Sequence, residues 1–293
     1  MRPKPKKIRR NSLFLLGANR AQALALLFLL LLIPGACSKD DVLLSSGKSD
    51  YAKVSVRPVS IEGDTLTLLY QWDMAPEWHI YWINPGDAGL APKFGYDSSA
   101  VSQIVQTHWP APHRLGNEVV VSYGFGETVY ITQDLLLANT ASPLDLTIDL
   151  DWLECKEECL PAKANLALSI NDPANFTSIH SELLDLALQQ QPKRWMHQVR
   201  GLVSGDTLTL DFGPAPVPDN FYVYPAAKGW YETTASQKAR HSEESRLKVD
   251  IPTASGGDFE SLLAGVLELH AVGENDSLAG FYSFQAPVLV KNN

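Results

Sequence analysis

An unbroken alternation of apolar and polar side chains runs from Leu144 to Trp152 and restricts what this chain can fold into. Leucine, isoleucine or tryptophan occupies each even position, and aspartate or threonine occupies each odd one. Successive side chains of a β-strand point to opposite faces, so the pattern predicts a strand with one buried and one solvated face. Apolar residues also recur at every second position over 66–72 and 166–170. Many short strands separated by Pro and Gly favour β-sandwiches over a parallel sheet.

An internal repeat predicts two related β-domains. The six residues Gly63–Leu68 recur letter for letter as Gly205–Leu210, and both copies stand near the start of a strand-like segment. Between them, 173–192 has helical spacing of apolar residues, with Asp172 as the expected cap and a proline at each end. We therefore predict an all-β protein: two immunoglobulin-like β-sandwich domains, at 51–172 and 193–293, joined by a short helical linker at 173–192.

The first 37 residues have the features of a bacterial export signal. Seven basic residues and no acidic one precede Cys37, and an apolar run of about thirteen residues, from Ala21 to Ile33, ends in small residues. Such a run is too short to span a bilayer comfortably as a permanent helix, although an uncleaved anchor is the alternative. Residues 38–50 are rich in Ser, Lys and Asp, and we expect them to form a flexible tether.

Gly35-Ala36-Cys37 resembles a lipobox, at which a lipoprotein is cleaved and its new N-terminal cysteine is acylated. The pattern prefers Leu where Pro34 stands, and Ser38 follows the cysteine instead of the Asp that retains lipoproteins in the inner membrane. We expect a lipid on Cys37, and a periplasmic protein anchored to an envelope membrane, with the outer membrane favoured.

The charge after Cys37 excludes nucleic acid as a partner. Of the 24 basic residues, 7 precede Cys37, so 17 basic and 33 acidic residues remain, a net charge of 17 − 33 = −16. A surface this acidic repels phosphate backbones.

Cys155 and Cys159 are the thiols left if Cys37 carries a lipid. A strong strand leads into Cys155 and a weaker one leaves Cys159, so a three-residue turn would place the two residues opposite each other in a hairpin. The turn, Lys156–Glu158, contains no glycine for the left-handed position that such loops use, so we expect a strained and labile disulfide. Nearby glutamates disfavour a thiolate, which predicts a reductant more than an oxidant.

Two other interpretations of the cysteine pair stay open. A structural staple is one, but closing so small a loop removes little chain entropy, about 2 kcal/mol. A copper or zinc site is the other, although no His stands close in sequence and the chain has only three Met. His79 lies between aromatic residues and is interpreted as a packed core residue. We expect no metal and no cofactor.

Four segments, taken in order, resemble one known family. They are Trp78–Leu90, Trp109–Pro112, Tyr123–Gly124 and Asp151–Pro161. Together they resemble the periplasmic N-terminal domain of the thiol:disulfide interchange protein DsbD, in the variety found in ScsB-type suppressors of copper sensitivity. The resemblance covers 51–172. Phe221–Pro225 and the last strands resemble, less fully, the second β-domain of the ScsB-type region.

The resemblance implies an immunoglobulin-like fold in which Cys155 and Cys159 cycle between dithiol and disulfide. Family members take electrons from a thioredoxin-like domain by way of a membrane domain and pass them to periplasmic substrates. Ser122–Glu127 resembles the family's cap, where Tyr123 or Phe125 would shield the sulfurs from stray oxidants; ordinary core packing is the other interpretation of these aromatics. The chain has no Cys-x-x-Cys and neither a multi-span nor a thioredoxin-like segment, so we expect a partner to supply the electrons.

The resulting hypothesis is an envelope thiol–disulfide exchange protein that acts through Cys155 and Cys159, as a component of a protein-disulfide reductase. The expected partners are a thioredoxin-like or membrane electron carrier, a disulfide-bonded periplasmic client, and the membrane by way of the lipid. The alternatives are a non-catalytic β-sandwich adaptor with a permanent disulfide and a copper-handling module.

Overall fold

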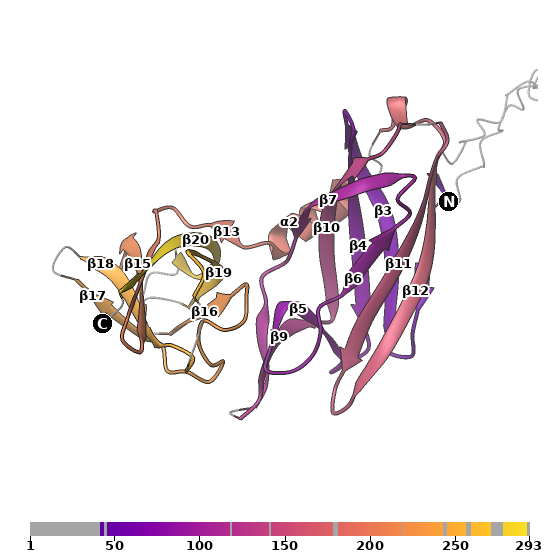
Figure 1. Cartoon of the computed structure of the whole chain (residues 1–293). Helices are drawn as coiled ribbons and strands as arrows, with labels where there is room; N and C mark the ends of the chain where they lie inside the picture. Colours follow the sequence, from indigo (N-terminus) through magenta and orange to yellow (C-terminus); the bar gives the residue numbers. More distant parts are fainter. Residues whose placement is uncertain are drawn as a thin grey trace, which may run out of the picture. The chain divides into compact units, whose positions relative to one another are not determined.

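The computed structural model describes residues 42–43, 46–117, 119–140, 142–177, 181–218, 220–242, 245–255, 259–270 and 278–291. Strands make up most of this part of the chain, and the rest is turns, loops and short helical segments (Figure 1). They form two immunoglobulin-like β-sandwiches, joined by a short helical segment, as the sequence predicts. No helix among these residues is long and apolar enough to cross a membrane.

The first sandwich consists of two sheets. One sheet has the strand order β1 (Val42–Leu43), β12 (Cys159–Ile170), β11 (Leu144–Cys155), β5 (His79–Gly86), β9 (Val121–Gly126) and β8 (His113–Gly116), with β6 (Lys93–Tyr96) also paired to β11. The other has the order β2 (Ser46–Lys48), β3 (Ala52–Glu62), β4 (Thr65–Met74), β10 (Thr128–Leu137) and β7 (Val101–His108). All pairings in both sheets are antiparallel.

The strands of the second sandwich follow one another in a continuous hydrogen-bonded order. The order is β16 (Phe221–Pro225), β19 (Leu262–Leu269), β20 (Gly280–Lys291), β14 (Arg200–Ser204), β15 (Thr207–Pro214), β18 (Arg246–Pro252) and β17 (Lys238–His241). The short β13 (Lys193–Arg194) pairs with β20. Strand β20 pairs with β19 over its first part and then, from Val288 onward, with β14 in parallel. It therefore connects two groups of strands that would otherwise be separate.

The alternating sequence of β11 produces the predicted alternating burial. Its even-numbered residues from Leu144 to Trp152 are at most 3 % exposed, whereas its aspartates at 145 and 149 are exposed. The buried face packs into the core of the first sandwich, where the Trp72 and Trp152 rings meet edge to face with centroids 6.4 Å apart. Burying aromatic rings of this size removes a large apolar area from water, which holds the two sheets together.

The repeated hexapeptide forms the same structure in both sandwiches, a hairpin turn and the start of the strand that follows it. Gly63 and Gly205 each have φ +60° and occupy the first position of a two-residue hairpin turn, before β4 and β15. A positive φ at this position is the requirement of a type II′ turn, which favours glycine. The leucines that follow, at 66, 68, 208 and 210, are all fully buried. The repeat therefore marks equivalent hairpins in two cores.

The connecting segment is helical over part of the predicted range. Asp172 accepts a hydrogen bond from the Asn175 N–H and begins a 3₁₀ turn, η2 (Pro173–Asn175), and α2 (Ser181–Gln190) follows. Ala187 of α2 is fully buried in a small cluster with Tyr130 and other residues of β3, β4 and β10. The helix is thus packed against the first sandwich.

The expected tether at 38–50 differs from what the structure shows for its described part. Val42–Leu43 pairs with the end of β12, and Ser46–Lys48 pairs with β3. A Cβ on Gly47 would lie 2.4 Å from the Ala164 side chain, so this segment passes close against β12. Free backbone groups at two sheet edges, which the composition of the segment does not reveal, hold it as edge strands.

Candidate functional site

The β11–β12 hairpin brings the two cysteines together. The strands pair residue by residue from Leu144 with Ile170 to Cys155 with Cys159, so the two cysteines are the last pair before the turn. Their Cα atoms are 4.2 Å apart and their sulfurs form a disulfide bond. The alternating strand sets this register, because a slip of one residue would move its entire apolar face out of the core.

The two cysteines differ in their access to solvent. Cys155 is 2 % exposed, whereas Cys159 belongs to the exposed residues at the tip of the hairpin. A thiol–disulfide exchange requires an incoming sulfur to reach one of the two bonded sulfurs. Cys159 is the exposed residue of the pair, and Cys155 is the buried one.

The turn between the cysteines closes without the left-handed residue that three-residue hairpin loops commonly use. The Lys156 N–H donates to the Glu158 carbonyl at 3.2 Å. Among the described non-glycine residues, a positive φ occurs at Glu77, Glu127 and Ser245, and thus at none of the three turn residues. This turn therefore does not require a glycine. The exposure of Cys159 remains as the structural reason to expect a reactive disulfide.

Tyr81, on β5, contacts the disulfide directly. Its hydroxyl oxygen lies 3.2 Å from the Cys159 sulfur, and the residue is 2 % exposed. Burial raises the pKa of Tyr81, so the hydroxyl keeps its proton at neutral pH and can donate it to sulfur. Gly89 leaves the room for this ring, since a Cβ there would lie 2.2 Å from the tyrosine ring. Tyr81 stands in the motif Trp78–Leu90, but nothing in the linear sequence assigned it to the cysteines.

His79 lies next to Tyr81 on β5. It is the register partner of Cys155, and its ring meets the Tyr81 ring edge to face at 5.2 Å. Burial lowers the pKa of His79, because a charged imidazole loses hydration there. The imidazole is therefore neutral at pH 7 and half-buried beside Cys155, which is a less complete burial than the core position that the sequence suggests.

The carboxylates around the pair have different environments. Glu154 is 2 % exposed and accepts a hydrogen bond from the Ser49 hydroxyl at 2.5 Å. Lys156 forms an ion pair with Glu77 at 2.5 Å, and Glu157 and Glu158 are exposed. Most of the acidic charge is thus either held by a partner or solvated, which weakens its effect on a nearby thiolate.

The two expected cap residues lie on the core side of β9. Ile80 pairs with Phe125, whereas the strand neighbours of His79 and Tyr81 on β9 are Gly126 and Gly124. Tyr123 and Phe125 are at most 3 % exposed and belong to the main core cluster. This placement differs from a cap over the sulfurs and agrees with the alternative of core packing, since side chains on a strand alternate between faces.

The hydroxyl of Tyr123 forms a hydrogen bond with a residue of the second sandwich. It lies 2.7 Å from the hydroxyl of Tyr222, and its ring also meets the Tyr224 ring edge to face at 5.2 Å. The Asn84 side-chain amide donates to the Pro225 carbonyl at 2.8 Å. Both β9 and β5, the strand that carries Tyr81, are therefore held by residues of β16.

The described residues contain no group of three or more His, Cys, Asp or Glu side chains placed to hold a metal ion. Cys37, the expected lipid attachment site, lies outside the described residues.

Comparison with known proteins gives two matches. The family model "Thiol:disulfide interchange protein DsbD, N-terminal" matches residues 50–170. Among solved structures, the N-terminal periplasmic domain of ScsB from Proteus mirabilis is similar, with a TM-score of 0.62 and 18 % sequence identity; the match covers 84 % of this chain and 95 % of that one. No curated protein matches the sequence.

Proposed function

Because residues 50–170 form a DsbD-like N-terminal domain, we propose that this protein exchanges thiols and disulfides with partner proteins through Cys155 and Cys159. The observation that carries the proposal is the unequal pair: a disulfide at the tip of a hairpin with Cys159 exposed and Cys155 buried. A structural staple has no need of an exposed cysteine, whereas exchange requires that a partner sulfur can reach one of the pair.

In the reducing direction, the Cys159 thiolate attacks one sulfur of a partner disulfide. A Cys159–partner mixed disulfide forms, and the other partner sulfur leaves as a thiolate that takes up a proton. The Cys155 thiolate then attacks the Cys159 sulfur, forming the Cys155–Cys159 disulfide and releasing the second partner thiolate. Two electrons pass to the partner. The same steps in reverse, with the dithiol of an electron donor, regenerate the reduced pair.

Tyr81 and His79 assist different sulfurs in this scheme. The Tyr81 hydroxyl, 3.2 Å from the Cys159 sulfur, donates a hydrogen bond to the thiolate and stabilises it as nucleophile and as leaving group. The neutral imidazole of His79, the register partner of Cys155, is available to accept the Cys155 proton when that thiol has to attack.

The proposed setting is the periplasm, with a lipid on Cys37 anchoring the protein to an envelope membrane and the outer membrane favoured. The leader sequence supports export, and the similar ScsB domain is described as periplasmic. The proposed partners are a thioredoxin-like or membrane electron carrier and a disulfide-bonded client. Labelled fatty acid should be incorporated into the wild-type chain in cells and not into Cys37→Ala.

The test of exchange is a trap for the mixed disulfide. In a Cys37→Ser background, Cys155→Ser leaves the exposed thiol without its resolving partner, and Cys159→Ser is the matched control. Each is mixed with an oxidised thioredoxin-like protein and resolved on a non-reducing gel. Cys155→Ser should accumulate a one-to-one adduct and Cys159→Ser should accumulate far less. If neither forms an adduct, and the wild-type disulfide resists mild reductant, the protein is an adaptor with a permanent disulfide.

A further inference from the structure

The second sandwich contains a polar cleft with a volume of about 700 Å³, away from the cysteines in sequence and built by other strands. Its lining includes His197, Arg200, Asp211, Ser242, Arg246 and Lys248. A volume in this range is typical of sites for small organic molecules and far exceeds that of a single simple ion. The lining, however, is mostly polar and charged, which disfavours an apolar ligand.

The charged side chains stand in a row across neighbouring strands. Arg200 of β14 is the register partner of Asp211 of β15, and Asp211 is the partner of Lys248 of β18. Directly paired residues project from the same face of a sheet. Arg246 stands two residues before Lys248 on β18 and therefore shares that face. The sheet itself gathers three cations around one carboxylate.

A β-bulge shapes the wall of the cleft. The register between β15 and β18 shifts between Asp211 and Gly213, and Gly213 has φ +83°. A Cβ on Gly213 would lie 2.8 Å from the His197 Cβ, so glycine here lets His197 approach the bulge closely. Bulges of this kind redirect side chains and are frequent beside binding sites.

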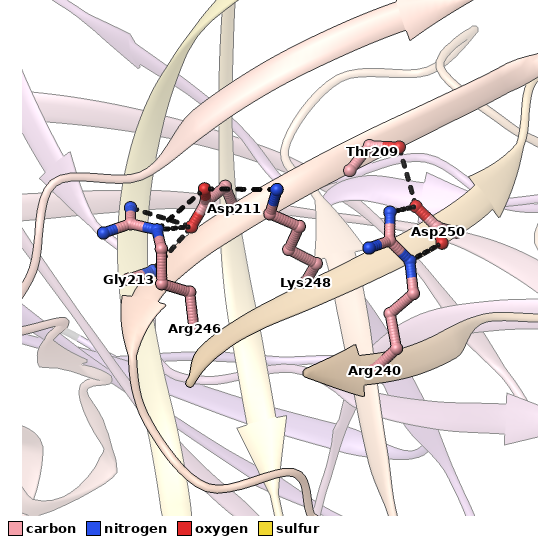
Figure 2. Close-up of polar contacts among 7 residues, drawn as sticks. All are labelled: Thr209, Asp211, Gly213, Arg240, Arg246, Lys248 and Asp250. Atoms are coloured by element: carbon pink, nitrogen blue, oxygen red, sulfur yellow. Dashed lines mark hydrogen bonds and ion pairs between the residues drawn. The ribbon is translucent and has the colours of Figure 1, made fainter. Parts of the chain in front are cut away.

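Asp211 holds Arg246 in place, as Figure 2 shows. The Arg246 Nε lies 3.1 and 3.0 Å from the two carboxylate oxygens of Asp211, and the Gly213 N–H donates to one of them at 3.0 Å. The Lys248 Nζ is 3.9 Å away. Burial acts to raise the pKa of Asp211, but the hydrogen bonds from Arg246 and Gly213 and the charges of Arg246 and Lys248 lower it overall. The carboxylate is therefore ionised and neutralises one cation.

Positive charge remains after this pairing. Arg200, Arg246 and Lys248 against Asp211 give 3 − 1 = +2 for the described lining, with His197 counted neutral. Among the described residues none forms a hydrogen bond or ion pair with the guanidinium group of the exposed Arg200. The buried Ser242 hydroxyl likewise has no hydrogen-bond partner in the described part of the chain. The residues after Cys37 have a net charge of 17 − 33 = −16, so most of the surface repels anions. The positively charged lining of the cleft is an exception.

We propose that this cleft binds a small organic anion through carboxylate or phosphate groups, with Arg200 and Lys248 contacting the anion and Arg246 oriented by Asp211. Guanidinium groups present planar pairs of donors that match both oxyanions, and lysine adds a point charge. The second sandwich then has a ligand-binding role that is separate from thiol exchange.

The test is a calorimetric titration of the full chain with three probes: citrate, inorganic phosphate and uncharged glycerol. Citrate or phosphate should bind saturably and glycerol should not. A response to citrate alone assigns the site to carboxylates, and a response to phosphate alone assigns it to phosphate groups. No saturable binding of either anion overturns the proposal.

Matched variants distinguish the cleft from general electrostatics. Lys248→Gln and Arg200→Gln should each weaken binding by about tenfold or more, as expected for loss of a charged hydrogen-bond donor. Lys238→Gln, on the neighbouring strand β17, and Arg57→Gln, in the first sandwich, remove the same charge outside the cleft and should change affinity less than about twofold. Equal weakening by cleft and control variants contradicts the proposal. If Arg200→Gln unfolds, Arg200→Lys replaces it and should bind with intermediate affinity; affinity unchanged in a folded Lys248→Gln would also contradict a cleft site.

Discussion

Replacing Tyr81 by phenylalanine removes one hydroxyl group next to the reactive sulfur and leaves the rest of the site in place. The ring would still fill the space beside Gly89, where it packs closely. What disappears is the contact of 3.2 Å between the hydroxyl oxygen and the Cys159 sulfur. In the proposed mechanism this hydroxyl donates to the Cys159 thiolate of the reduced protein, so Tyr81→Phe should raise the pKa of that thiol.

The size of the effect follows from the strength of one hydrogen bond to a charged group. Such bonds contribute about 1.5–3 kcal/mol, and one pKa unit corresponds to about 1.4 kcal/mol, so the thiol pKa should rise by about one to two units. At a pH below the thiol pKa of both wild type and Tyr81→Phe, the fraction of Cys159 present as thiolate falls about tenfold for each unit by which the pKa rises. A thiolate with a higher pKa is also a stronger nucleophile. On a logarithmic scale, this gain in rate offsets somewhat less than half of the loss in thiolate fraction. The attack should therefore slow by about 3- to 15-fold.

The assay is the rate of alkylation by iodoacetamide against pH, in a chain with Cys37→Ser and Cys155→Ser so that only Cys159 reports. The midpoint of the rate profile should move to higher pH in Tyr81→Phe. Tyr130→Phe, which removes a hydroxyl in the small cluster beneath α2, should leave the midpoint unchanged. A Tyr81→Phe profile that superimposes on that of the control would show that the tyrosine does not stabilise the thiolate.

Three further outcomes are expected. Burial lowers the pKa of His79, so below about pH 6.5 the unfolded chain binds more protons than the folded one, and the free energy of unfolding falls as pH falls. Urea unfolding at about pH 7.5 and about pH 5.5 should therefore show a smaller drop in the free energy of unfolding for His79→Gln than for wild type. Gly89→Ala should disturb the disulfide site as well as stability, because its φ is +97° and the new Cβ would meet the Tyr81 ring at 2.2 Å. The control Gly63→Ala has φ +60° and no atom within 4 Å of the new Cβ. It should lower the free energy of unfolding by only about 1–2 kcal/mol through backbone strain and leave the alkylation rate of Cys159 unchanged. Leu208→Ala, at a fully buried position, should lower the free energy of unfolding by about 2.7–5 kcal/mol; a loss below about 1 kcal/mol would mean that the second core is not packed as described.

The parts of the fold that the sequence predicts well are those governed by local patterns. Strict alternation in 144–152 predicts β11 and its buried face, and the repeated hexapeptide predicts two related β-domains, in each of which it precedes a strand. The described part of the expected tether at 38–50 forms edge strands instead. Pairing at a sheet edge depends on backbone groups that any sequence carries, so a polar composition does not exclude it.

The candidate site is predictable only in part for a related reason. The hairpin places Cys155 opposite Cys159 because both belong to one local unit. Tyr81 reaches the Cys159 sulfur from β5, 78 residues earlier in the chain, and this contact exists only through tertiary pairing. The orientation of Tyr123 and Phe125 likewise depends on which face of β9 meets the core. The two glycines at 124 and 126 were the available signal, because they leave the cysteine-side face of β9 without side chains.

Thiol exchange requires that the bond between Cys155 and Cys159 opens and closes reversibly under conditions that proteins in the envelope experience. The most direct measurement is an equilibrium titration of the purified chain in glutathione and dithiothreitol buffers, with alkylation and mass spectrometry to count oxidised and reduced molecules. A reversible two-electron transition is expected above about −300 mV, where exchangeable disulfides lie, and well below the about −120 mV of strong periplasmic oxidants. A disulfide that stays closed at potentials below about −300 mV would be a permanent staple and would rule out thiol exchange by this pair.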